Sequence, residues 1–165
     1  MRGLTEIDNK VYVAKENSSK LEVYNGLTFH QLSVIAVKGL EDPCDIVACR
    51  DDRQLFVAES DAIWQVSTSV RGQYVKFLTL DTTADKYRAP LMSLMFRHLL
   101  VISQPRSIHQ HSTTDRRQLR VVHLPQYVKE LCHAVETKRG TFVVGHLGTS
   151  KNGRQSAVSI DWFLL

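Results

Sequence analysis

Two histidines one residue apart, His109 and His111, are the side chains of this sequence best placed to bind a metal ion. In an extended strand, residues two apart point to the same side of the sheet. A third ligand, such as His98 or His123, would complete a zinc site. The equivalent positions elsewhere in the chain hold Trp, Val, Glu and Tyr, so the position carries no constant chemistry, and a packing role is favoured.

Five of the seven acidic residues between positions 41 and 61 could supply oxygen ligands to a calcium ion, which needs several converging oxygens. The matching positions in other parts of the chain are mostly basic, which opposes a shared calcium site. No G-x-S-x-G nucleophile motif and no phosphate-binding loop is present. The sequence therefore predicts no bound metal, no cofactor and no catalytic residue. The acidic residues are Glu41, Asp42, Asp45, Glu59 and Asp61, and the matching positions are Lys86, Arg88, Arg106, Lys129 and Glu130.

Positive charge is concentrated in the C-terminal part of the chain. Residues 97–165 hold 10 of the 21 Lys and Arg residues but only 4 of the 17 Asp and Glu residues. The densest basic group is Arg116, Arg117 and Arg120, near His123 and Tyr127. Arginine and aromatic side chains together bind phosphates and stack on bases. RNA is therefore one candidate partner, although a solvated turn explains the same residues.

The cysteines and the apolar runs indicate the compartment. Cys44, Cys49 and Cys132 form no C-x-x-C pair, lie in or beside apolar runs, and are predicted to be small buried side chains. The chain starts with charged residues rather than an apolar leader, and no apolar run approaches the roughly 20 residues of a membrane helix. We expect a reducing, cytoplasmic location and no membrane partner.

A repeat of about 43 residues organises the whole chain. The run Leu55–Ala58 has counterparts 44 residues earlier at Val11–Ala14 and 44 residues later at Leu99–Ile102, and a further one at Thr141–Val144. Other short apolar runs recur at matching distances. Runs at residues 5–7, 45–49, 91–96 and 131–136 precede these, runs at 21–24, 63–66, 108–111 and 158–161 follow them, and a further run follows in the first three units at 32–37, 75–80 and 119–124. The runs are four to eight residues long, rich in β-branched and aromatic residues, and separated by turn formers, which indicates strands. Four antiparallel strands per unit are typical of a β-propeller blade.

One unit resembles an NHL-type repeat. In residues 43–66, "PCDIVACRDDRQLFVAESDAIWQV", a proline precedes the inner strand, a polar turn follows, and "LFVAES" matches the family's "LYVAD-S". The first unit, "DNKVYVAKENSSKLEVY", matches in part, and the third, "RHLLVISQPRSIHQH", matches in its apolar skeleton. The basic or Asn-rich cluster of the family is absent at residues 60–62.

The resemblance implies a function as well as a fold. NHL modules of tripartite-motif proteins bind RNA or select substrates for ubiquitin transfer, but the RING and B-box cysteines are absent here. Propellers of related shape also include calcium-dependent lactonases, so a metal-dependent hydrolase of the lactonase type is the alternative.

The predicted architecture is an all-β propeller of about four blades, each of four antiparallel strands, in a single domain. The units span approximately residues 4–37, 44–80, 90–124 and 130–165. NHL-like propellers usually have six blades. The chain is therefore a fragment of a longer one, closes as four blades, or pairs with another chain, and we favour a fragment with an incomplete or open array. The last unit lacks a clear fourth strand unless residues 163–165 begin it.

We expect a non-catalytic binding scaffold. In a propeller, the loops between second and third strands and those that link units gather on one face, and such loops carry recognition. Six of the eight residues predicted on this loop face are basic, so the expected partner is an acidic protein segment or RNA, the latter through the basic C-terminal half. The eight residues are Glu59, Asp61, Lys86, Arg88, Arg106, Lys129, Lys151 and Arg154.

Overall fold

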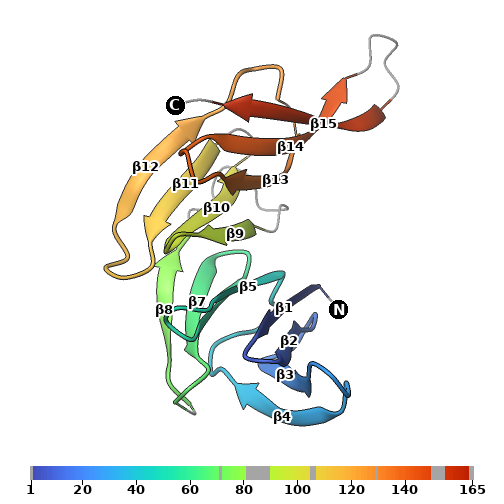
Figure 1. The fold of residues 1–165 in the computed structure, drawn as a ribbon, viewed down its shortest axis with the longest axis vertical. Helices are drawn as coiled ribbons and strands as arrows, with labels where there is room; N and C mark the ends of the chain where they lie inside the picture. Colours follow the sequence, from blue (N-terminus) through green and yellow to red (C-terminus); the bar gives the residue numbers. More distant parts are fainter. Residues whose placement is uncertain are drawn as a thin grey trace. The chain divides into compact units, whose positions relative to one another are not determined.

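The fold consists of antiparallel sheets. The structure, a computed structural model, describes residues 2–70, 72–80, 90–104, 107–128, 130–149 and 155–163, and these residues contain no helix, membrane-spanning or otherwise. Four separate sheets follow one another along the chain (Figure 1). The chain divides into two compact units, residues 1–90 and 91–165, and each unit contains two of the sheets.

The first unit holds two four-stranded sheets in which each strand pairs with the next along the chain. The first sheet consists of β1 (Gly3–Ile7), β2 (Lys10–Ala14), β3 (Lys20–Asn25) and β4 (Gln31–Ala36). The second sheet consists of β5 (Asp45–Cys49), β6 (Gln54–Ala58), β7 (Ala62–Ser67) and β8 (Tyr74–Thr79).

The second unit holds one four-stranded sheet and one with three described strands. The third sheet consists of β9 (Leu91–Met95), β10 (His98–Gln104), β11 (Ser107–Ser112) and β12 (Gln118–His123). The fourth sheet consists of β13 (Glu130–Glu136), β14 (Phe142–Thr149) and β15 (Gln155–Phe163).

The four-sheet architecture predicted from the repeat is confirmed. Strands β1 to β13 begin and end within two residues of the predicted runs, whereas β14 and β15 are longer than predicted. Phe163 is the last residue of β15, so it does not begin a fourth strand of the last sheet.

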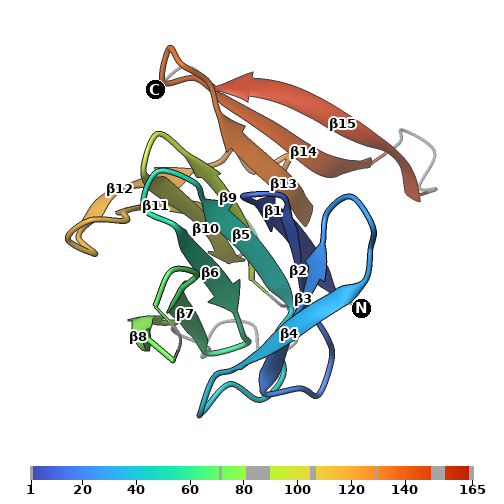
Figure 2. The ribbon, with the colours of Figure 1, turned by 60° about the horizontal axis from the view of Figure 1, so that its bottom comes forward.

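Tight turns and close backbone contacts set the geometry of the first unit. The β1–β2 hairpin closes through only two residues, Asp8 and Asn9, whose φ angles are 53° and 58°. Two consecutive positive φ angles define the type I′ turn, which matches the twist of the strands it joins. A Cβ atom added to Gly3 would lie 3.0 Å from the side chain of Ile46, so glycine permits the close approach of β1 to β5 seen in Figure 2.

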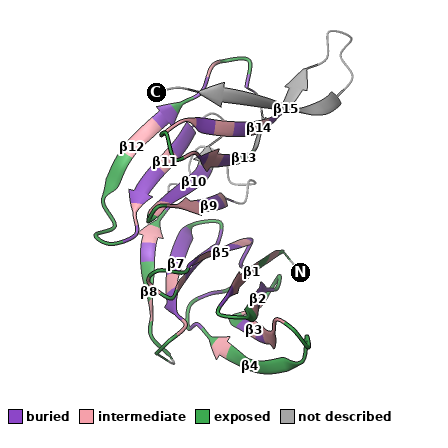
Figure 3. Cartoon of the chain, viewed as in Figure 1, coloured by how far each residue is buried: buried purple, intermediate pink, exposed green. Residues whose placement is uncertain are grey.

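The core of the first unit lies between its two sheets. Tyr12 and Ala14 of β2 belong to one buried cluster with Leu55 and Val57 of β6. Phe56, between those two β6 residues in sequence, points to the opposite side of its sheet. Burial is therefore greatest on the middle strands and declines toward β4, as Figure 3 shows.

The second unit repeats this arrangement at equivalent positions. Leu100 and Ile102 lie 88 residues after Tyr12 and Ala14, and they contact Phe142 and Val144 of the next sheet. The same members of the repeat thus face the following sheet in both units. Apolar side chains of two neighbouring sheets together form each core, since one side of a single sheet would leave them in water.

Substitution of Leu55 by alanine tests this packing. Leu55 is fully buried between sheets, so Leu55→Ala removes apolar contacts and leaves a cavity, and we expect it to lower the free energy of unfolding by about 2–5 kcal/mol. Leu27→Ala is the matched control, because that side chain is 79% exposed and should change stability by less than about 0.5 kcal/mol. Urea denaturation followed by circular dichroism measures both. Equal losses would contradict burial between sheets.

Candidate functional site

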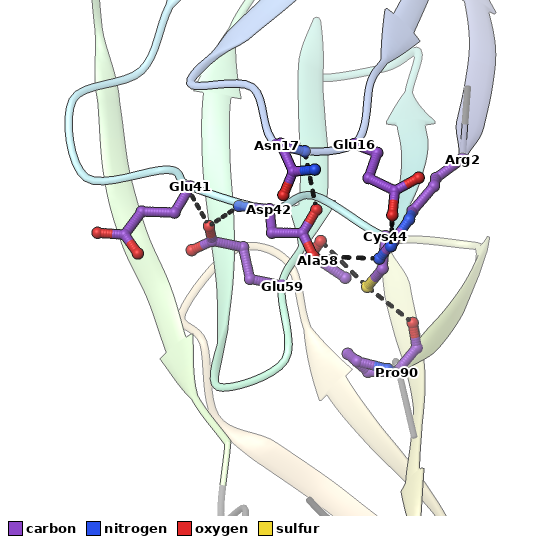
Figure 4. Close-up of polar contacts among 9 residues, drawn as sticks. All are labelled: Arg2, Glu16, Asn17, Glu41, Asp42, Cys44, Ala58, Glu59 and Pro90. Carbon is purple, nitrogen blue, oxygen red and sulfur yellow. Dashed lines mark hydrogen bonds and ion pairs between the residues drawn. The ribbon is translucent and has the colours of Figure 1, made fainter. Parts of the chain in front are cut away.

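The loops predicted to carry recognition do gather in the first unit. The β2–β3 turn (residues 15–19), the linker from β4 to β5 (residues 37–44) and the β6–β7 turn (residues 59–61) are joined by hydrogen bonds (Figure 4). We call these three segments the loop face of the first unit.

Glu59 is the centre of this face, but it is not exposed. The side chain retains only 6% exposure. One carboxylate oxygen accepts the backbone N–H groups of Glu41 and Asp42 at 2.5 and 3.2 Å, and the other accepts the Trp64 indole N–H at 2.6 Å. The prediction that Glu59 is presented to a partner is therefore wrong. Its carboxylate is buried, and both oxygens already accept hydrogen bonds from the linker or from Trp64.

Gly39 and Trp64 hold the middle of the linker. Gly39 has a φ of +97°, a conformation that residues with a Cβ rarely adopt, and an added Cβ would lie 2.9 Å from the Trp64 ring. On the same ring, the Lys76 ammonium lies 5.3 Å from the centroid, a cation–π distance. The indole thus contacts the linker, Glu59 and a lysine at once.

A second carboxylate ties the β2–β3 turn to the same linker. Asp42 accepts the backbone N–H of Asn17 at 2.9 Å and a guanidinium N–H of Arg2 at 3.2 Å. Arg2 also pairs with Glu16, and the hydrogen bond to Glu16 is the main cause that raises the pKa of the guanidinium. These groups are partly exposed, so they orient the loops more than they stabilise the fold.

Cys44 closes the linker as a buried thiol, as predicted. Its sulfur lies 3.2 Å from the carbonyl oxygen of Ala58 and 3.5 Å from that of Pro90. Burial, with a smaller contribution from the Asp45 carboxylate, raises the pKa of Cys44 to about 12. Because the thiolate is the nucleophile, the thiol of Cys44 is inert at neutral pH. Cys49 is likewise buried and free.

The exposed part of the loop face is a polar hollow of about 260 Å³. Asp61, predicted on this face, is exposed and lines it together with exposed Glu41 and with Lys76. Carboxylates therefore predominate in the described part of the face. The other six predicted residues lie outside the described residues: Lys86, Arg88, Arg106, Lys129, Lys151 and Arg154.

The two candidate metal-binding histidines occupy different environments. His109 is half-buried and contacts Ser107 at 3.2 Å and Gln118 at 3.4 Å. His111 is buried, and burial, followed by the charge of His109, lowers its pKa. The β11–β12 pairing shifts register between Gln110 and His111. Across the described ranges, no three His, Cys, Asp or Glu side chains converge as metal ligands.

Of the predicted basic group of Arg116, Arg117 and Arg120, Arg116 and Arg117 are exposed, whereas Arg120 is engaged within the fold. Arg120 donates to Glu136 at 2.7 Å and to Gln110 at 2.6 Å, and its guanidinium lies 4.6 Å from the Phe142 ring centroid. Gln110 donates to the second oxygen of Glu136 at 2.7 Å. Arg120 thus neutralises a buried carboxylate between the third and fourth sheets and is not available to a phosphate.

Sequence reasoning did not anticipate either buried carboxylate. Glu59 directly follows β6, whose last residue is Ala58, and Glu136 is the last residue of β13. Both are buried at the end of an apolar run. An acidic residue at the end of an apolar run was the signal in the sequence that could have indicated a buried carboxylate. The groups that donate hydrogen bonds to Glu59 and Glu136 lie on other strands or on a linker, so no local sequence pattern identifies them.

Comparison with solved structures identifies the fold. Hydrazine synthase from Kuenenia stuttgartiensis matches with a TM-score of 0.67 and 17% identity, covering 97% of this chain and 49% of that one. The β-propeller domain of Cps50 (Swd1) from Myceliophteria thermophila matches with a TM-score of 0.63 and 9% identity, covering 98% and 56%. This chain has a β-propeller fold.

A chain of the mitotic checkpoint complex is similar as well, with a TM-score of 0.64 and 15% identity, covering 88% of this propeller and 43% of that chain. The propeller thus spans about half the length of these structures. No protein-family model matches the sequence, and no curated protein matches it. The propeller fold is therefore established, whereas the NHL type is not.

Replacement of Glu59 tests whether its carboxylate holds the β4–β5 linker in place. Glu59→Ala leaves two backbone N–H groups and the Trp64 indole without their acceptor, and we expect a loss of about 2–3 kcal/mol in the free energy of unfolding. The exposed neighbour Asp61 is the control, and Asp61→Ala should cost less than about 0.5 kcal/mol. A Glu59→Ala protein as stable as the wild type would show that the carboxylate does not hold the linker.

The Cys44 thiol predicts an alkaline pH dependence. Its folded pKa, about 12, lies above the ordinary value of 9.0, so the folded state keeps a proton that the unfolded state loses as the pH rises through 9. Stability from this group is complete below pH 9 and should fall by about 1 kcal/mol by pH 10. Urea denaturation at pH 8 and pH 10 should show a smaller decline for Cys44→Ala than for the wild type. Equal declines would mean that the thiol ionises in the fold.

Proposed function

We propose that this chain is a non-catalytic propeller scaffold that recognises a segment of a partner protein through its loop face. The observation that carries the proposal is the loop face itself. Three loops from two neighbouring sheets are fixed by Glu59 and Asp42 from within, while Glu41 and Asp61 stay exposed beside the hollow. Loops held rigid before binding lose less entropy when a partner is ordered on them.

The charges beside the hollow favour a protein over RNA. Exposed carboxylates repel phosphates, whereas they attract a lysine or arginine of a partner. Arg120, part of the candidate phosphate-binding patch, is engaged by Glu136. The similarity to a chain of the mitotic checkpoint complex, a protein assembly, supports a protein partner. The role of the six predicted basic residues outside the described ranges stays a prediction.

Three labelled probes test the proposal by fluorescence anisotropy at low salt: an arginine-rich peptide, a glutamate-rich peptide and a single-stranded RNA. We expect the arginine-rich peptide to bind and its Kd to rise about threefold or more in Asp61→Asn and Glu41→Gln, since each variant removes a charge at the hollow. Asp51→Asn, at an exposed position in the β5–β6 turn, is the control and should change Kd less than twofold.

Two outcomes contradict the proposal. Binding of RNA alone, weakening steeply with salt, would indicate a nucleic-acid scaffold. A melting temperature that rises on addition of calcium would indicate a cation site and favour the metal-dependent hydrolase.

A further inference from the structure

The outer strand of the first sheet, β4, is an open and unprotected edge. It pairs with β3 on one side and with no described strand on the other. Its sequence, Gln31–Ala36, contains no charged residue and no proline. Proteins usually protect such edges with charges or prolines, because the free N–H and C=O groups of an edge strand accept another strand.

Exposed apolar side chains are concentrated on this edge. Leu32 and Val34 of β4 are 51% and 41% exposed, and Leu27 and Phe29 of the preceding turn are more exposed still. Figure 3 shows β4 as largely exposed. On the corresponding outer strand β8, Val75 is the only exposed large apolar residue. A contiguous apolar patch of this kind marks a contact surface.

A groove of about 290 Å³ runs beside the same strand. It is lined by residues 32–35 of β4, by Tyr12 and Val23 of the same sheet, and by residues 67–69 of the neighbouring sheet in the same unit. Alternate side chains of an added strand point to opposite sides. A strand laid along β4 would therefore place every second side chain toward this groove.

The charges around β4 indicate the chemistry of its partner. Residues 23–40 contain no Asp or Glu. Lys10 lines the groove, Lys20 lies opposite Ala36 in the β3–β4 pairing, and Lys38 follows the strand. All three are exposed, and none forms an ion pair with a residue that the structure describes.

The acidic residues of the first sheet do not neutralise these lysines. Each carboxylate of β1 to β3 and their turns already has a cation: Glu6 pairs with Arg50, Asp8 with Arg53, Glu16 with Arg2 and Glu22 with Lys15. Three lysines without an ion pair to a described residue thus lie near β4, one in the groove, one on β3 and one just after the strand. This combination suits a segment that carries both apolar and acidic side chains.

We propose that the outer edge of β4 binds an extended segment of a partner protein, in which acidic and apolar residues alternate, as a fifth strand of the first sheet. Main-chain hydrogen bonds to β4 hold the segment, its apolar side chains enter the groove, and its carboxylates meet the three lysines. Of the residues in this proposal only Lys38 belongs to the loop face, and it does not line the hollow beside Glu41 and Asp61. This surface therefore does not depend on the loop-face proposal.

A nine-residue fluorescein-labelled peptide in which glutamate alternates with valine is the probe, measured by anisotropy at about 50 and 300 mM salt. We expect binding that weakens with salt, and a Kd about tenfold or more higher for Leu32→Glu and Val34→Glu, which replace apolar contacts by repulsion. Val75→Glu, at the corresponding exposed position of β8, is the matched control and should change Kd less than twofold. Circular dichroism confirms that each variant is folded.

The peptide and the lysines supply two independent checks. Prolines at two successive central positions of the peptide remove one N–H that points toward β4 in either register, and they should abolish binding, since a fifth strand needs that donor. The triple variant Lys10→Gln, Lys20→Gln, Lys38→Gln should bind the probe with a much smaller dependence on salt. Asp61→Asn, which impairs the loop face, should leave binding of this probe unchanged, so the two proposals fail separately.

Several results overturn the inference. These are the absence of binding at 50 mM salt, equal binding of a peptide with lysine in place of glutamate, and equal losses in Val34→Glu and Val75→Glu. Sedimentation velocity tests a further contradicting result. If the wild type self-associates while Val34→Glu is monomeric, and the probe does not bind, the edge of β4 pairs with a second copy of this chain instead of a partner segment.

Discussion

Burial of apolar side chains between neighbouring sheets is the interaction on which the rest of this structure depends. A single repeat unit of this kind cannot bury its apolar face alone, and a stacked neighbouring sheet supplies the core. Tyr12 and Ala14 are buried in one cluster with residues of the next sheet, among them Leu55 and Val57. Leu100 and Ile102 are buried by Phe142 and Val144 in the same way. The loops, the linkers and the edge strand all take their positions from this packing.

The same packing explains why buried carboxylates occur at sheet junctions. A carboxylate removed from water is costly unless donors surround it. Glu59 finds its donors on the linker and on Trp64, and Glu136 finds them on Arg120 and Gln110 of the adjacent sheet. In each case one acidic group joins segments that apolar contacts alone would leave free to slide. These hydrogen bonds hold the three segments of the loop face together, as the proposed recognition role requires.

Much of the fold followed from the repeat, and little of the site did. Strand positions depend on local properties, the alternation of apolar residues and the chemistry of turns, so runs such as Asp45–Cys49 were located to the residue. The exposure of Glu59 was predicted wrongly because its donors come from residues 41, 42 and 64, which no periodicity relates to it. Arg120 was misjudged for the same reason, since its partner Glu136 belongs to another sheet.

The amino-acid sequence alone determined that this protein is a repeated array of short antiparallel strands, because a strand's own side chains and turns specify it. It also determined which half of the chain carries excess positive charge. Only the tertiary structure decided which charged groups interact within the fold, as Glu59 and Arg120 do. It also decided which are exposed to solvent, as Asp61 and the lysines near β4 are. The physical reason is that the state of a charge depends on the groups around it, and folding brings those groups from distant parts of the chain.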